Sequence, residues 1–169
     1  MQFTLLQSFT PDDLITITAS GVVDFRAGGG ADENAAGISL EPAFVGTSNQ
    51  VTDVASGRSL EAGALAIWNN SLGAFNLFPV DASTGLGSSS PPTNLSVTRR
   101  IGDVFSTSGF SGLSAGEEFR LLNVDVNSGN SGSFTVSLSF QSVPEPSSLS
   151  IFAAMLTFCA TRRKRSARR

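Results

Sequence analysis

The sequence predicts an all-β protein, an antiparallel β-sandwich followed by a C-terminal hydrophobic helix and a basic tail. Two observations indicate the sandwich. Short runs with strand-like alternation lie between breaker-rich stretches at residues 28–30, 83–92 and 127–132. No part of residues 1–142 keeps a helical period for more than about two turns. A third observation, an uncharged apolar segment before a basic terminus, indicates the helix and tail. We therefore expect one domain at 1–142 and a separate tail at 143–169.

The first strand is predicted at residues 14–19. Ile15 and Ile17 alternate with Thr16 and Thr18, so one face is apolar and the other polar. Gly21 can bend the chain before a second run at 22–25. Four further strand candidates follow, at residues 63–68, 74–80, 95–98 and 119–126.

The last strand, at residues 134–140, has the cleanest period of two. Its apolar face comprises Phe134, Val136, Leu138 and Phe140, and its polar face comprises Thr135, Ser137 and Ser139. Such a strand suits a sheet with one face on a core and the other in water. We expect the N-terminal and C-terminal strands to lie next to each other, because this protects exposed sheet edges. Residues 83–94 are expected to form a surface loop without chemistry.

Charge is divided unevenly along the chain. Residues 1–142 hold five Arg, no Lys and 13 of the 14 acidic residues, whereas the final eight residues hold six of the 11 basic groups. An acidic body with few cations does not fit nucleic acid, whose phosphates are bound by Lys and Arg. We therefore expect no nucleic-acid partner.

Several catalytic classes are excluded by residue type. The chain has no His, and its single cysteine, Cys159, lies in the apolar segment of the tail. The body therefore cannot form a Ser-His-Asp triad, a Cys-His pair or a His-containing zinc site. We expect Cys159 to act as a small hydrophobic residue, with lipidation as the alternative. No enzyme activity and no cofactor are predicted, apart from the calcium considered below.

Catalysis by paired carboxylates is not excluded by the composition. They occur as adjacent pairs at 12–13, 32–33 and 117–118. Glycosidases need two carboxyl groups facing each other across a cleft, whereas neighbours on a strand point to opposite faces. Solvated turn positions are the simpler interpretation. Trp68, with Asn69 and Asn70, could stack on a sugar ring, or it could belong to the core.

A calcium site is one interpretation of residues 123–132. Asp125, Asn127 and Asn130 supply hard oxygen ligands in a tight turn before the last strand. The spacing is not that of an EF-hand. The alternative is a plain hairpin turn, in which Asn and Gly are chosen for positive φ.

The tail carries a motif in three parts. Val143, Pro144, Glu145 and Pro146 break regular structure, an apolar segment follows at 147–161, and the basic tail at 162–169 begins with Arg162, Arg163, Lys164 and Arg165. This arrangement resembles the PEP-CTERM sorting signal of exported bacterial proteins. The resemblance implies an exosortase-type processing enzyme as partner, cleavage near Pro144–Pro146, and delivery to the cell envelope or extracellular matrix.

The apolar segment is short for a permanent membrane anchor. Its 15 residues span about 22 Å as a helix, against a hydrocarbon core of about 30 Å. A signal that is inserted and then cleaved fits this length better than a durable anchor. Residues 1–10 have neither the basic nor the apolar region of a secretory signal. Either the start has been assigned too late, which we favour, or the signal has been lost.

The body also resembles the bacterial calcium-dependent galactophilic lectins, in segments 13–21, 63–65, 125–126 and 130–136. The resemblance implies a jelly-roll, galactose-binding-like sandwich, with calcium bridging protein and sugar through Asp125 and Asn130. Gly129 stands where the family has a second Asn ligand, and the chain has no Tyr for the ligand of an earlier loop.

These observations together predict a non-catalytic protein of the cell surface or extracellular matrix that binds carbohydrate. Its expected partners are the processing enzyme, the membrane through the tail, and an extracellular polysaccharide. The alternatives are a structural matrix protein without a defined ligand and a hydrolase that uses carboxylates.

Overall fold

The fold is all-β with antiparallel strands, as predicted. The computed structural model describes residues 1–24, 32–40, 46, 50–52, 57–124 and 131–144. Within these ranges α1 (Ile101–Val104) is the one α-helix. The hydrophobic helix predicted at 147–161 and the basic tail at 162–169 lie outside them.

The strands form two main sheets and a small hairpin. The first sheet has the order β1 (Gln2–Thr4), β9 (Glu118–Asn123), β6 (Leu65–Asn69) and β7 (Gly73–Asn76). In the second sheet, β2 (Leu14–Asp24) pairs along its full length with β10 (Ser131–Gln141). The other side of β2 pairs with β8 (Asn94–Arg100) and, at its end, with β3 (Asp32–Glu33). A third pair joins β4 (Gln50–Thr52) and β5 (Ser59–Glu61).

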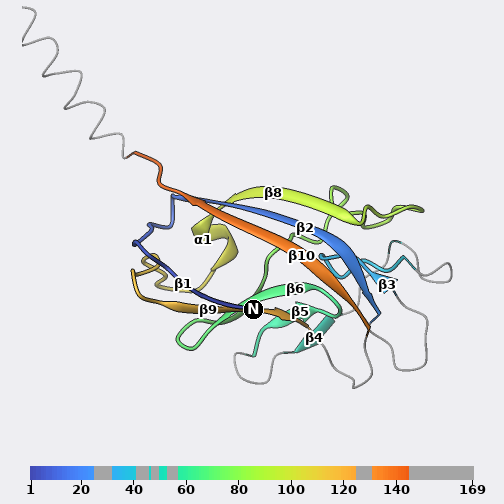
Figure 1. Cartoon of the computed structure of the whole chain (residues 1–169), viewed down its shortest axis with the longest axis horizontal. Coiled ribbons are helices and arrows are strands. Elements are labelled where there is room, and N and C mark those ends of the chain that lie inside the picture. Colours follow the sequence, from blue (N-terminus) through green and yellow to red (C-terminus); the bar gives the residue numbers. More distant parts are fainter. Residues whose placement is uncertain (25–31, 41–45, 47–49, 53–56, 125–130, 145–169) are drawn as a thin grey trace, which may run out of the picture.

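The two main sheets face each other as layers of a sandwich, with α1 closing one end between them (Figure 1). Alternation along β2 directs Ile15 and Ile17 to the inner face of the sandwich, where both are fully buried. They belong to the same apolar cluster as Ile67 and Phe119 of the opposite sheet. On the outer face, the hydroxyls of Thr16 and Thr98 hydrogen-bond at 2.9 Å across the β2–β8 pair.

β6 is buried on both faces, which the alternation rule does not anticipate. Leu65 and Ile67 point into the main core, whereas Ala66 packs with Leu60 and Val124 in a second apolar cluster. The β4–β5 pair contributes Leu60 and Val51 to this cluster and so covers part of the outer face of the first sheet.

Several predicted strand boundaries differ from the structure, and three of the differences have a clear local cause. β2 continues through Gly21 as one strand, because glycine tolerates the φ of +112° found there. β6 begins at Leu65, two residues late, because Gly63 has a φ of +74° and the N–H of Ala64 bonds back to Glu61. β7 ends at Asn76, shortly before Pro79, which cannot donate a ladder hydrogen bond.

The predicted adjacency of the N-terminal and C-terminal strands is confirmed. The first and last strands predicted from the sequence, at 14–19 and 134–140, correspond to β2 and β10, which pair along their full length. β1, which alternation did not predict, pairs with β9 in the other sheet. It meets β10 through side chains, since the rings of Phe3 and Phe140 lie 6.4 Å apart.

Candidate functional site

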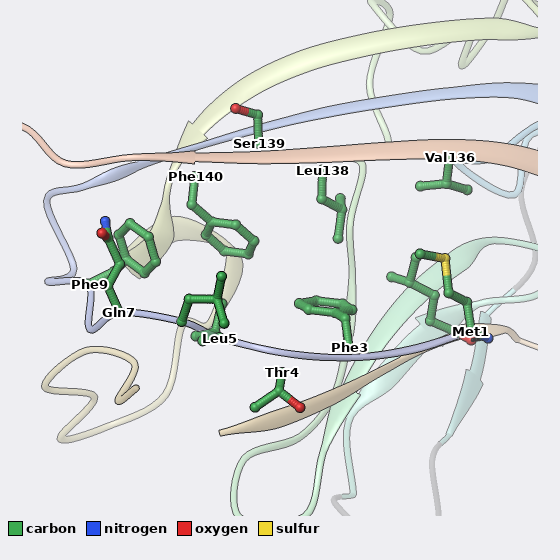
Figure 2. Close-up of a pocket in the computed structure, with 12 residues that line it drawn as sticks. Met1, Phe3, Thr4, Leu5, Gln7, Phe9, Val136, Leu138, Ser139 and Phe140 are labelled. Atoms are coloured by element: carbon green, nitrogen blue, oxygen red, sulfur yellow. Dashed lines mark hydrogen bonds between the residues drawn. The ribbon is translucent and has the colours of Figure 1, made fainter. Parts of the chain in front are cut away.

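An apolar groove runs between β10 and the N-terminal segment, at one open side of the sandwich. Figure 2 shows side chains of both segments pointing toward each other across it. The groove has a volume of about 570 Å³ and is lined mainly by Phe3, Leu5, Phe9, Val136, Leu138 and Phe140. Phe9 and Phe140 close one end, with ring centroids 5.1 Å apart.

The rim of this groove exposes large apolar side chains. Leu6 is 96% exposed and Met1 is 80% exposed, and both line the groove. All side chains that line it are uncharged. Contiguous exposed apolar surface is rare on soluble monomers and usually marks a contact site.

Asp13 connects three parts of the chain where β10 ends. Its Oδ2 accepts a hydrogen bond of 2.6 Å from the N–H of Thr10, and its Oδ1 accepts one of 2.6 Å from the N–H of Val143. Its own carbonyl accepts from the N–H of Ile101 at 2.8 Å, at the start of α1. Asp13 is only 4% exposed, so the expectation of a solvated turn position is wrong for this residue.

The environment of Asp13 favours its charged form. Burial raises the pKa of the carboxyl, but the backbone N–H groups of Thr10 and Val143 and the side chain of Thr10 lower it. The net effect is a pKa below the ordinary value of 3.8. The carboxylate therefore stabilises the point at which the chain leaves the sandwich.

A polar cleft of about 330 Å³ lies between β5, β7, β8 and α1. Two arginines line it. The guanidinium of Arg58 lies 3.9 Å from the ring centroid of Phe75 and donates to the carbonyl of Leu72. Arg99 donates to the carbonyl of Asp103 at 2.9 Å. These backbone contacts hold both cations in defined positions in the cleft wall.

Glu61 contributes a buried carboxylate to the same cleft. Its Oε1 accepts from the side-chain amide of Gln50 at 2.9 Å. Its Oε2 has no hydrogen-bond donor among the residues that the structure describes, although the residue is only 4% exposed. A buried carboxylate oxygen without a donor is costly, so a ligand that brings an O–H or N–H group would stabilise it if the cleft wall opened to admit the ligand. Asp103 also lines the cleft.

The sequence-predicted site residues are only partly described. Asp125 and Asn130, the calcium candidates, lie outside the described residues, as do Glu145, Pro146, Arg162, Arg163, Lys164 and Arg165. Val143 and Pro144 are described and exposed, outside any strand. Within the described ranges there is no group of three or more His, Cys, Asp or Glu residues that could hold a metal ion.

Glu33, in the predicted pair at 32–33, is buried in β3, so the expectation of a solvated position is wrong for this residue too. Asp12, Glu117 and Glu118 form no catalytic dyad with one another. The exposed Asp12 forms an ion pair of 3.0 Å with Arg100. Glu118 is exposed and accepts from the side chain of Gln2 at 3.0 Å. Glu117 instead accepts from the N–H of Ser114 at 3.1 Å. These carboxylates support turns and the β1–β9 edge.

Trp68 packs against the core, which is one of the two interpretations of this residue. The indole is half-buried against the second apolar cluster, and the guanidinium carbon of Arg120 lies 5.3 Å from its ring centroid. Asn69 is buried. Its Oδ1 accepts from the N–H groups of Ser71 and Leu72, and its Nδ2 donates to the backbone carbonyl of Glu118. Asn69 therefore shapes a turn.

Asn34 is a buried polar residue that the sequence pattern did not indicate. Its Oδ1 accepts from the N–H groups of Ala36 and Ile38, and its Nδ2 donates to the carbonyls of Thr84 and Pro92. The loop at 83–94, predicted as a surface loop, is therefore fixed to the core through Thr84 and Pro92. Only the position of Asn34, one residue after an acidic pair and before an Ala-Ala-Gly turn, could have suggested this.

No protein-family model, curated protein or solved structure matches this chain. In the part of the chain that the structure describes, no helix has the length and apolar character needed to cross a membrane. The function is therefore argued from the tail motif and from the groove and cleft of the sandwich.

Proposed function

We propose that this chain is an exported β-sandwich of the cell surface or extracellular matrix, sorted by its C-terminal PEP-CTERM-like signal. One observation carries the proposal. Asp13 anchors the N–H of Val143, and the first two motif residues, Val143 and Pro144, are exposed directly after this anchor. The first two residues of the proposed processing motif are therefore accessible at the end of the described sandwich.

Processing predicts a defined mature protein. The full chain, fused to a secretory signal and produced in a bacterium with an exosortase, should appear at the surface without residues 162–169. Intact-mass spectrometry measures this. A Pro144→Ala/Pro146→Ala variant should accumulate uncut, whereas an Asp12→Asn control should be processed normally. Surface protein that still carries Arg168 and Arg169 would overturn the proposal.

We further propose that the sandwich is a jelly-roll, galactose-binding-like module that binds carbohydrate without catalysis. The Glu61 cleft supports this, because the orphaned Oε2 can accept a hydrogen bond from a sugar hydroxyl, and Arg58 and Arg99 can donate to hydroxyl oxygens. The two antiparallel sheets and the non-local β2–β10 pair are compatible with the scaffold. Calcium held by Asp125 and Asn130 stays a prediction.

Glycan binding can be measured on the full chain in a detergent without a sugar headgroup. Titration calorimetry with galactosides and with bacterial exopolysaccharide should give heat that a Glu61→Gln variant reduces at least tenfold. Glu118→Gln, an exposed strand position, is the matched control. Repeating the titration in a calcium chelator tests the calcium contribution, together with Asp125→Ala. No heat with any glycan would favour a structural matrix protein.

A carboxylate hydrolase is the second candidate, because Glu61 and Asp103 line one cleft. New reducing ends during incubation with the bound polysaccharide would favour the hydrolase. Unchanged polymer length would favour binding alone.

A further inference from the structure

In the part of the chain that the structure describes, no strand covers the outer edge of β10. β10 pairs with β2 over Ser131–Gln141, without a break in register, and no described strand pairs with its other edge. About half of its backbone N–H and C=O groups therefore point away from β2. Proteins usually protect such edges with charge, proline, bulges or shortness. β10 has 11 residues, no proline and no charged side chain.

The side chains of β10 are suited to pairing with an identical strand. Its inward residues Phe134, Val136, Leu138 and Phe140 are only half-buried, although they pack against the core. Its outward residues Thr135, Ser137 and Ser139 are small and exposed. Figure 2 shows Ser139 directed away from the groove and Leu138 directed into it.

We propose that two copies of this chain associate through antiparallel pairing of their β10 strands around a two-fold axis at Val136. Val136 is the centre of the strand, so this register uses all 11 residues. Leu138 then lies opposite the partner's Phe134, and Thr135 lies opposite the partner's Ser137. Apolar side chains meet apolar ones on the inner face, and hydroxyls meet hydroxyls on the outer face. About ten new backbone hydrogen bonds join two sheets into one.

Charge favours a second copy at this edge over other faces. Residues 1–142 carry 13 acidic and five basic residues, so most contacts between copies are repulsive. Neither β10 nor the N-terminal segment at 1–9, which forms the other wall of the groove, contains an Asp, Glu, Lys or Arg. Two copies can approach here without like charges facing each other.

The available area is that of a stable dimer. A strand of 11 residues is about 36 Å long, and two packed sheets with their outer side chains are about 20 Å thick. The edge therefore offers about 700 Å² per copy, close to the ~800 Å² per partner of standard interfaces. The contact also shields the mouth of the apolar groove and its exposed rim.

Disulfide crosslinking tests the register directly. In full-length protein with Cys159→Ser, Val136→Cys places two thiols at the axis, where Cα atoms are about 5 Å apart and a disulfide can form. Ser139→Cys is the matched control, because its copies are about 20 Å apart along the strands. Oxidation in non-glycosidic detergent should give a covalent dimer with Val136→Cys and less than a tenth as much with Ser139→Cys.

Mass measurement gives an independent test. At tens of micromolar, light scattering coupled to chromatography should show twice the monomer mass for the wild type. Thr135→Lys/Ser137→Lys brings like charges face to face and should weaken the dissociation constant at least tenfold. Ser108→Lys/Ser111→Lys adds the same charge at exposed loop positions and should leave the dimer intact. Circular dichroism and a cooperative melt check that each variant is folded.

Three results would overturn the proposal. One is a monomeric wild type at these concentrations, as expected if another segment of the chain fills the groove. The second is a dimer insensitive to the β10 lysines, which would assign association to the tail. The third is equal crosslinking at positions 136 and 139. None of these outcomes depends on whether the tail is processed or the cleft binds glycan.

Discussion

Asp13 is the residue whose loss should affect the fold most specifically. Both carboxylate oxygens accept backbone N–H groups, from Thr10 and Val143. Asp13→Asn replaces one acceptor by an NH₂ donor, so two donors face each other in a buried site. We expect a loss of about 1–3 kcal/mol in the free energy of unfolding at pH 7, measured by urea denaturation. Asp12→Asn, an exposed ion-pair position, should cost less than about 1 kcal/mol.

The same variant should change the pH dependence of stability. Because the pKa of Asp13 is lowered in the folded state, its contribution is complete above the unfolded value, near 3.8. The contribution is lost as pH falls through the folded pKa. Between pH 5 and pH 2 the wild type should therefore lose more stability than Asp13→Asn. Parallel curves for the two proteins would contradict the assigned role of the carboxylate.

At the scale of elements, Gly21 allows the long β2–β10 pair to continue. A Cβ at this position would lie 2.3 Å from the carbonyl oxygen of Ser133, on a backbone with φ of +112°. Gly21→Ala should therefore destabilise the protein by about 2–4 kcal/mol. Gly109→Ala is the matched control, with a φ of +79° and nothing within 4 Å, and should cost about 1 kcal/mol. Equal melting temperatures for the two variants would contradict the steric argument.

Period-two alternation predicted elements that are buried on one face. The inner face of β2 is apolar, and the same rule applies to β10, so both were found from local sequence. β6 was found but its two-sided burial was not, since β4 and β5 supply the outer cover from a separate part of the chain. β7 ends shortly before Pro79, and β6 begins after Gly63. The alternation of apolar and polar residues does not take either effect into account.

At the scale of the whole molecule, sequence reasoning predicted the fold class and the adjacency of the long strands β2 and β10, but not the pair β1–β9. β1 and β9 join residues more than 100 positions apart, and no local pattern encodes such a partner. The polar cleft was missed for the same reason. Arg58 and Glu61 flank or belong to β5, whereas Arg99 comes from β8, and each one alone looks like an ordinary surface residue.

The anchor at Val143 also determines how far the molecule can reach. It lies at one end of the β2–β10 pair, whose 11 residues extend for about 36 Å. For a chain held by its tail, Asp24 and Ser131 form the distal end of this rod. In the proposed antiparallel dimer the two Val143 anchors lie at opposite ends of the joined β10 strands, so the two copies cannot both stand upright on one surface.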